Sequence, residues 1–182
     1  MPVSPEPGSQ RTLSLYLRAL WDLAPRLATL PAGNPARPIL GIEGSRPVLH
    51  LPPTGDEALR LARAAHAAAH LSFGGMPFER ARLKPVQRAL LEILEDARVE
   101  WLAMQALPGL RRLWAPHHVA DADCGNGAEA LLARLTHCLF DPEHGDGHAW
   151  MARVRSLFFT PQGGLALATP AQLREAASRL GN

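Results

Sequence analysis

One long, largely apolar segment limits the folds open to this chain of 182 residues more than any other feature. The segment PVQRALLEILEDARVEWLAMQAL begins at Pro85, a residue type that favours the first position of a helix, and Pro108 follows its end. Its apolar residues cover most of the circumference that a helix presents, as is typical of a buried helix. The sequence therefore predicts a long central helix with other elements packed around it.

Five further segments repeat apolar residues at helical spacing. Thr54 or Asp56 can cap the second of them, and Thr169 can cap the last. Pro25 is expected to kink or end the first. The segments are residues 12–30, 56–72, 127–140, 149–159 and 169–182.

Two short β-prone pieces, PILGIEG and PVLHLPP, flank a turn at Gly44-Ser45. They predict a small β-hairpin or edge strand near residues 38–52. The expected fold class is mainly α, a single helical domain over residues 11–182. Residues 1–10 are expected to form a flexible N-terminal arm.

Composition and motifs exclude several classes of function. The formal net charge is +2, and the arginines are interleaved with glutamates, so no nucleic-acid partner is predicted. No apolar run is long enough to span a bilayer, and no Gly-rich phosphate loop occurs, so neither membrane insertion nor nucleotide binding is expected. Cys124 and Cys138 form no paired motif, which favours reduced thiols in the cytoplasm.

The stretch AAHAAAHLSF places His66 and His70 four residues apart. On a helix that spacing brings two side chains to one face, about 5–6 Å apart at Cβ, where both imidazoles can bind one metal ion. Zinc peptidases have a glutamate after the first histidine, and it takes a proton from the metal-bound water. Here Ala67 occupies that position, so we expect a metal-ligand pair, for zinc or another divalent transition metal, without hydrolytic chemistry.

A third ligand is expected from the acidic residues of the long helix. Helical periodicity places Asp96 and Glu100 nearer its apolar centre than Glu95. Glu95 can instead pair with Arg98 along the helix. His117, in the segment GLRRLWAPHH, is a further candidate ligand.

The same segment carries a candidate docking patch formed by Arg111, Arg112 and Trp114, because exposed arginine and tryptophan are frequent interface anchors. The alternative is that Trp114 packs against the main helices and leaves the arginines in solvent. A second histidine-rich stretch, HGDGH, resembles a metal-binding loop, but its glycines predict poor preorganisation and a solvated surface loop. Cys138 is expected to be a core residue.

Several of these segments together resemble a known family. They are AAHAAAHLSF, LKPVQRALLEILEDARVEWLAMQALPGLRRLWAPHH, ALLARLTHCLFDPEH and the closing RLGN, with LEDARVE followed by PGLRRLW the most specific part. They resemble the region before the von Willebrand A domain in NorD-type proteins, which are nitric-oxide-reductase activation proteins. The resemblance covers roughly residues 55–182.

The resemblance implies a partner, a target and a degenerate metal site. NorD-type proteins work with a MoxR-class AAA+ ATPase to bring a target metalloenzyme to its active state. Relatives with an intact HExxH before an EDxRxE helix make this region look like a zincin relic, with a zincin-like helix pair at its centre and Glu95 as the third ligand. The chain ends near where the von Willebrand A domain should begin, so that domain is expected to be absent.

Two functions therefore follow as expectations. The first is a non-catalytic adaptor or activator module of a MoxR/NorD-type system, which helps to mature a metalloenzyme such as nitric oxide reductase. The alternative is a zinc hydrolase-like enzyme that uses His66, His70 and an acid from residues 92–100. Ala67 favours the first.

Overall fold

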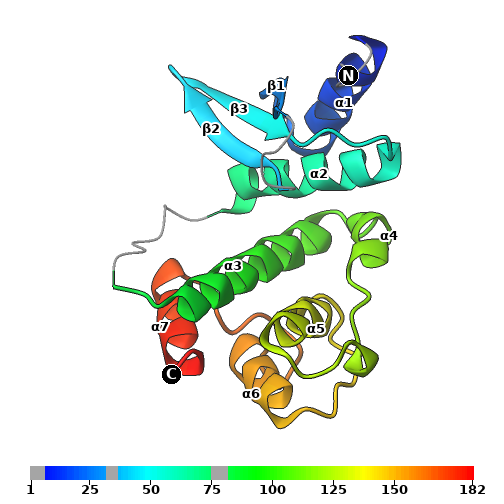
Figure 1. Ribbon diagram of the computed structural model, residues 1–182. Helices are drawn as coiled ribbons and strands as arrows, with labels where there is room; N and C mark the ends of the chain where they lie inside the picture. The colour runs from blue at the N-terminus through cyan, green and yellow to red at the C-terminus, as the bar shows by residue number, and fades with distance from the viewer. Residues whose placement is uncertain (1–6, 32–36, 75–81) are drawn as a thin grey trace. The chain divides into compact units, whose positions relative to one another are not determined.

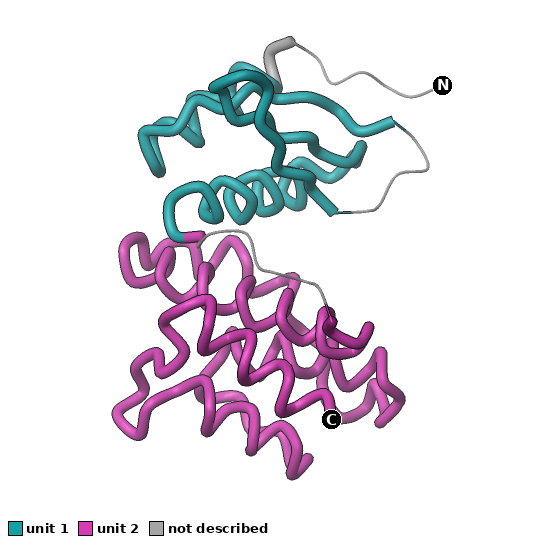
Figure 2. Tube along the Cα trace, turned by 90° about the vertical axis from the view of Figure 1, so that its left-hand side faces the viewer, with its two compact units in different colours: residues 1–73 teal, residues 74–182 magenta. Residues whose placement is uncertain are grey.

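The computed structural model describes residues 7–31, 37–74 and 82–182. The chain divides into two compact units, Met1–Phe73 and Gly74–Asn182, which Figure 2 distinguishes by colour. The fold is mainly α with one small sheet, as the sequence predicted. Each unit has its own apolar cluster, one around the small sheet and one around the long helix.

Unit 1 (Met1–Phe73) combines two helices with a three-stranded sheet (Figure 1). The strand order is β1-β3-β2, with β1 parallel and β2 antiparallel to β3. Gly44 makes the tight turn between β2 and β3 at a φ of 64°, a conformation that glycine adopts readily. The elements are α1 (Pro7–Trp21), β1 (Arg26–Thr29), β2 (Ile39–Glu43), β3 (Arg46–Leu51) and α2 (Glu57–Phe73).

The hairpin predicted near residues 38–52 is confirmed, whereas the helix predicted over residues 12–30 is too long. The helix ends at Trp21, Asp22 has a positive φ of 52°, and the chain then enters β1. There Leu27 lies opposite Leu49 of β3, a backbone pairing with a distant segment that local periodicity does not reveal.

The helix α1 begins at Pro7, within the residues 1–10 that were expected to form a flexible arm. Residues 1–6 lie outside the described residues. Asp56 accepts a hydrogen bond from the Leu59 backbone N–H at 3.1 Å, which confirms the predicted cap of α2. The helices and β3 of unit 1 share an apolar cluster, and its buried members are Leu13, Leu17, Leu49, Leu51, Ala64, Ala67 and Ala68.

Unit 2 (Gly74–Asn182) is helical in its described residues. The long helix α3 packs against α5 and α7, and α5 also packs against α6 (Figure 1). The predicted helices 85–107, 127–140, 149–159 and 169–182 are all confirmed to within a few residues. The elements are α3 (Pro85–Ala106), α4 (Leu110–Trp114), η1 (Ala115–His117), η2 (Ala122–Cys124), α5 (Ala128–Phe140), α6 (Ala149–Phe158) and α7 (Pro170–Leu180).

The two ends of unit 2's sequence meet at the start of α3. Gln87 donates to the Ser178 carbonyl at 3.0 Å, and its oxygen accepts from the Lys84 backbone N–H at 2.9 Å. A Cβ atom at Gly181 would lie 2.6 Å from Cγ of Gln87, so glycine is what allows this close approach. Thr169 caps α7 as predicted, accepting from Gln172 N–H at 3.3 Å.

None of the helices in the described ranges combines the length and the apolar character needed to cross a bilayer.

Candidate metal centre

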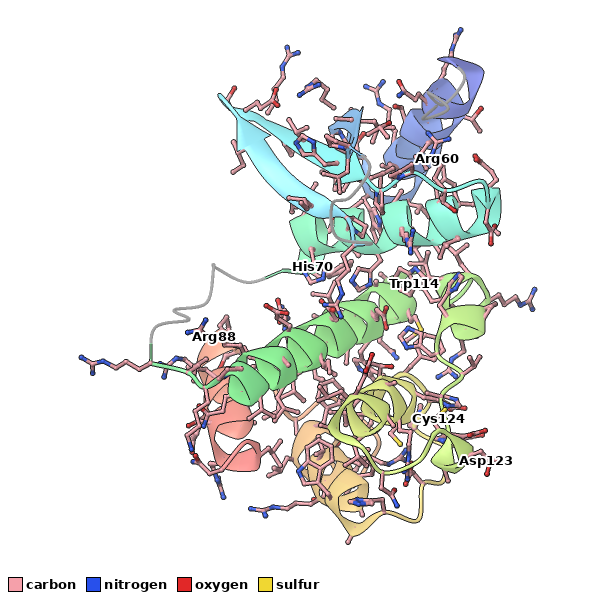
Figure 3. The ribbon with its side chains drawn as sticks, viewed as in Figure 1. Arg60, His70, Arg88, Trp114, Asp123 and Cys124 are labelled. Atoms are coloured by element: carbon pink, nitrogen blue, oxygen red, sulfur yellow. The ribbon has the colours of Figure 1, made fainter. Side chains whose placement is uncertain are left out.

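The two histidines of α2 present their ring nitrogens to each other. The Nε2 atoms of His66 and His70 are 3.3 Å apart, and the ring centroids are separated by 5.0 Å. Both side chains are half-buried, and Figure 3 shows His70 on α2. The predicted spacing on one helix face is therefore confirmed, and it brings the two rings into direct contact.

This separation suits a shared metal ion. Two nitrogen ligands of one tetrahedral zinc ion, each about 2.0–2.1 Å from it, are about 3.3–3.4 Å apart. The same 3.3 Å also suits a hydrogen bond in which one ring N–H donates to the other ring nitrogen. The 3.3 Å distance is therefore compatible with either a shared metal ion or a direct hydrogen bond between the two rings.

Ala67, the residue after the first histidine, is only 6% exposed and belongs to the apolar cluster of unit 1. An alanine has no proton-accepting group, so this position cannot supply the general base of a zinc peptidase. Alanines at 64, 67 and 68 also leave room for Leu13 and Leu17 of α1, which pack in the same cluster. The alanine-rich composition of α2 thus serves packing against α1.

The expected third ligands lie in unit 2, and two of them have charged or imidazole partners there. Glu95 accepts two hydrogen bonds from Arg98, at 2.7 and 2.8 Å, and both side chains are buried. Glu100 is also buried, with one carboxylate oxygen 3.2 Å from Nε2 of His118. Asp96 is half-buried, and His117 is exposed. Since α2 belongs to the other unit, the identity of a third ligand stays a prediction.

Helical periodicity predicted that Glu95 lies farther from the apolar centre of α3 than Glu100 does. This is wrong, because the two residues are equally buried, at 6% and 5% exposed. The physical reason is Arg98, whose guanidinium pairs with both carboxylate oxygens and so allows the charge to be buried. The pairing of Glu95 with Arg98 along the helix was the alternative that the sequence offered, and it is confirmed.

The candidate docking patch is divided between surface and interior. Arg111 and Arg112 are exposed, whereas Trp114 is 2% exposed. Arg111 lies over the Phe140 ring at 5.5 Å and 3.6 Å from an Asp141 oxygen. The alternative in which the tryptophan packs and the arginines stay in solvent is the one the structure adopts.

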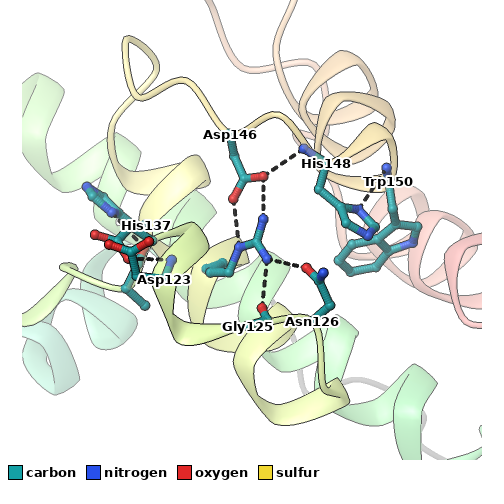
Figure 4. Close-up of polar contacts among 10 residues, drawn as sticks. Asp123, Gly125, Asn126, His137, Asp146, His148 and Trp150 are labelled. Carbon is teal, nitrogen blue, oxygen red and sulfur yellow. Dashed lines mark hydrogen bonds and ion pairs between the residues drawn. The ribbon is translucent and has the colours of Figure 1, made fainter.

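A buried polar network in unit 2 was not expected from the sequence. Arg134 of α5 donates to both carboxylate oxygens of Asp146, at 2.7 and 2.8 Å. It also donates to the Gly125 carbonyl and to Oδ1 of Asn126, both at 2.7 Å. Figure 4 shows Asp146 on one side of this network, with Gly125 and Asn126 on the other. These contacts tie the loop before α5 to the loop after it.

The electrostatics of this pair follow from its hydrogen bonds. The side chains of Arg134 and Asp146 are 3% and 1% exposed. The hydrogen bonds from Arg134 lower the pKa of Asp146 from 3.8 to about 2, and the backbone N–H of His148 adds to this effect. The sequence signal for the network was Arg134 in an otherwise leucine-rich helix, because a buried arginine needs a hydrogen-bonding partner.

The loop after α5 is better ordered than its glycines predicted. Arg155 of α6 donates to the carbonyl oxygens of Cys138, Asp141 and His144, at 3.1, 3.3 and 2.8 Å. It also donates to the Pro142 carbonyl. The prediction of a solvated, poorly preorganised loop was therefore wrong for its polar groups, because the buried Arg134 and the half-buried Arg155 hold them in place.

No protein-family model, no curated protein and no solved structure matches this chain.

Proposed function

We propose that this chain is a non-catalytic adaptor or activator module that binds one zinc or other divalent transition-metal ion at His66 and His70. The observation that carries the proposal is the 3.3 Å separation of their Nε2 atoms on one helix face. An ion bound there would have coordination positions left for a carboxylate or imidazole.

The non-catalytic assignment is supported by Ala67, which offers no general base next to the histidine pair. A hydrolase-like enzyme would need a base from elsewhere. The most buried acids of α3 are poorly suited to that role, since Glu95 is paired with Arg98 and Glu100 with His118.

The proposed partners are a MoxR-class AAA+ ATPase and a target metalloenzyme, in keeping with the NorD-like motifs. The exposed Arg111 and Arg112 are the proposed contact residues. Trp114 would contribute by packing beneath them, because it is buried. An arginine pair of this kind suits an acidic surface on the partner.

Elemental analysis of the protein, purified without a polyhistidine tag and incubated with zinc, tests the metal-binding part. We expect the variants His66→Ala and His70→Ala each to retain about one metal ion per chain fewer than the wild-type protein. His50→Ala of β3 is the matched control in the same unit and should retain as much metal as the wild type. Metal retention unchanged in both variants would overturn the assignment.

A pull-down with the MoxR-class ATPase of the same host tests the adaptor part. Wild-type protein should retain the ATPase, and the double variant Arg111→Ala/Arg112→Ala should retain much less of it. Failure of the wild-type protein to capture the ATPase would argue against this partner without affecting the metal result.

A further inference from the structure

We propose a second metal site, within unit 2, in which Cys138, His144 and Asp146 bind a zinc ion. One ligand atom from each residue lies within 4.8 Å of the other two. Tetrahedral zinc ligands are about 3.3–3.7 Å apart, so binding requires the ligand atoms to approach one another by at most about 1.5 Å. The site is separate from the His66–His70 pair and does not depend on it.

His144 gives the strongest reason to expect a ligand here. Its Nε2 atom is buried and has no hydrogen-bond partner among the described residues. A buried polar atom without a partner is costly, and imidazole nitrogen is among the commonest metal ligands. The ring is stacked on His137 with the centroids 3.8 Å apart, and His137 Nδ1 is 2.9 Å from the Ala120 carbonyl. The orientation of the His144 ring is thus limited by its neighbours.

Cys138 supplies a soft ligand from within α5. It is fully buried, and burial is the main reason that the pKa of its thiol is raised. Zinc binding would replace the thiol proton, forming one Zn–S bond and releasing one proton to solvent. A thiolate next to an imidazole favours zinc over magnesium or calcium, which prefer oxygen ligands.

Asp146 has room for one more bond. An ionised carboxylate offers about four lone-pair positions. Arg134 uses one on each oxygen, and the backbone N–H of His148 uses a second on Oδ1 at 2.9 Å. One position on Oδ2 is then left for a metal ion, while Arg134 orients the carboxylate as outer partners of metal ligands commonly do.

The surrounding charges set the expected strength of the site. Arg134 binds Asp146, and Arg155 holds the backbone carbonyls of Cys138 and His144. These two positive charges already oppose the carboxylate before a metal ion enters, and they would balance the thiolate that forms when the ion binds. We therefore expect weaker binding than at a zinc site without neighbouring arginines, and selectivity that rests on the Zn–S bond.

Titration of the full, reduced, untagged chain with cobalt(II) tests this site, because only thiolate ligation gives a sulfur-to-cobalt charge-transfer absorption. The wild-type protein should develop that band, and zinc should displace the cobalt. The band should be lost in Cys138→Ser and in His144→Ala. It should persist in Cys124→Ser, which changes the exposed cysteine on η2 (Figure 3), and in a His66→Ala/His70→Ala variant.

No charge-transfer band in the folded wild-type protein at excess cobalt would overturn the proposal, as would a band that survives Cys138→Ser. Circular dichroism reports whether each variant is folded. Should Cys138→Ser unfold, His144→Ala keeps the test decisive, because His144 lies in a loop outside the core cluster. A band of full intensity in folded His144→Ala would also contradict the site.

Discussion

The two candidate metal sites bring their ligands together in different ways. His66 and His70 lie one turn apart on α2, so a single helix determines their 3.3 Å separation. Cys138, His144 and Asp146 come from α5 and from the loop that follows it. In the second case two arginines, Arg134 and Arg155, hold the loop against the helix.

The two sites differ in how much supporting structure holds their ligands in place. A pair on one helix face needs little more than the helix. The cluster that joins α5 to the following loop depends on the buried pair of Arg134 and Asp146, whose hydrogen bonds must be made because a half-satisfied buried network is strongly destabilising. Substitutions in the supporting network should therefore affect stability far more in unit 2 than comparable changes at exposed polar contacts in unit 1.

The largest effect is expected for Asp146→Asn, which leaves the buried Arg134 guanidinium without its counter-charge. Breaking one partner of a buried ion pair costs about 3–5 kcal/mol. Urea unfolding followed by tryptophan fluorescence measures the change in free energy of unfolding. The matched control is Asp123→Asn in η2, an exposed aspartate expected to change stability by less than about 0.5 kcal/mol. Equal small losses in both variants would show that the network does not stabilise unit 2.

A smaller loss, about 2–3 kcal/mol, is expected for Ala67→Glu, because it forces a larger, charged side chain into the apolar cluster of unit 1. The same substitution at Ala58, an exposed position in the first turn of α2, should be neutral or slightly stabilising. Thermal unfolding of the two variants provides the comparison. If Ala67→Glu proved as stable as Ala58→Glu, the packing assigned to Ala67 would be incorrect.

The third prediction concerns how the stability of the fold changes at acid pH. The folded-state pKa of Asp146 is about 2, below its ordinary value of 3.8. Its ionised form therefore stabilises the fold above about pH 4, and this contribution is lost as the pH falls through 4 towards 2. Denaturant unfolding at a series of pH values should show a shallower loss over this window in Asp146→Asn than in wild type. Identical acid profiles would contradict the assigned shift.

The smallest effect is expected for Glu43→Gln, which removes the ion pair between Arg26 of β1 and Glu43 of β2. Both side chains are more than half exposed, at 53% and 57%, and exposed pairs contribute about 0.2–1 kcal/mol. The effect should shrink further in high salt, because salt screens exposed charges. A loss as large as that of Asp146→Asn would remove the contrast between the two units.

Local chemistry in the sequence was enough to locate most helices and one of the candidate sites. Pro85 and Thr169 marked the starts of α3 and α7, and Gly44 marked the hairpin turn. The spacing of His66 and His70 placed their rings together. Each of these features depends on residues within about four positions of one another, since caps, turns and helix faces are set by short-range geometry.

Tertiary structure alone decided the features that depend on distant partners. The strand β1 forms because Leu27 lies beside Leu49 of β3, 22 positions away. Pairing with β3 provides residues 26–29 with backbone hydrogen-bond partners that they lack by themselves. Packing of α6 against α5 brings Arg155 to the loop between them, and the fold of that loop brings Asp146 to Arg134. Helical period and capping carry no information about such pairings, because burial energy depends on which surfaces meet in space and not on their spacing along the chain.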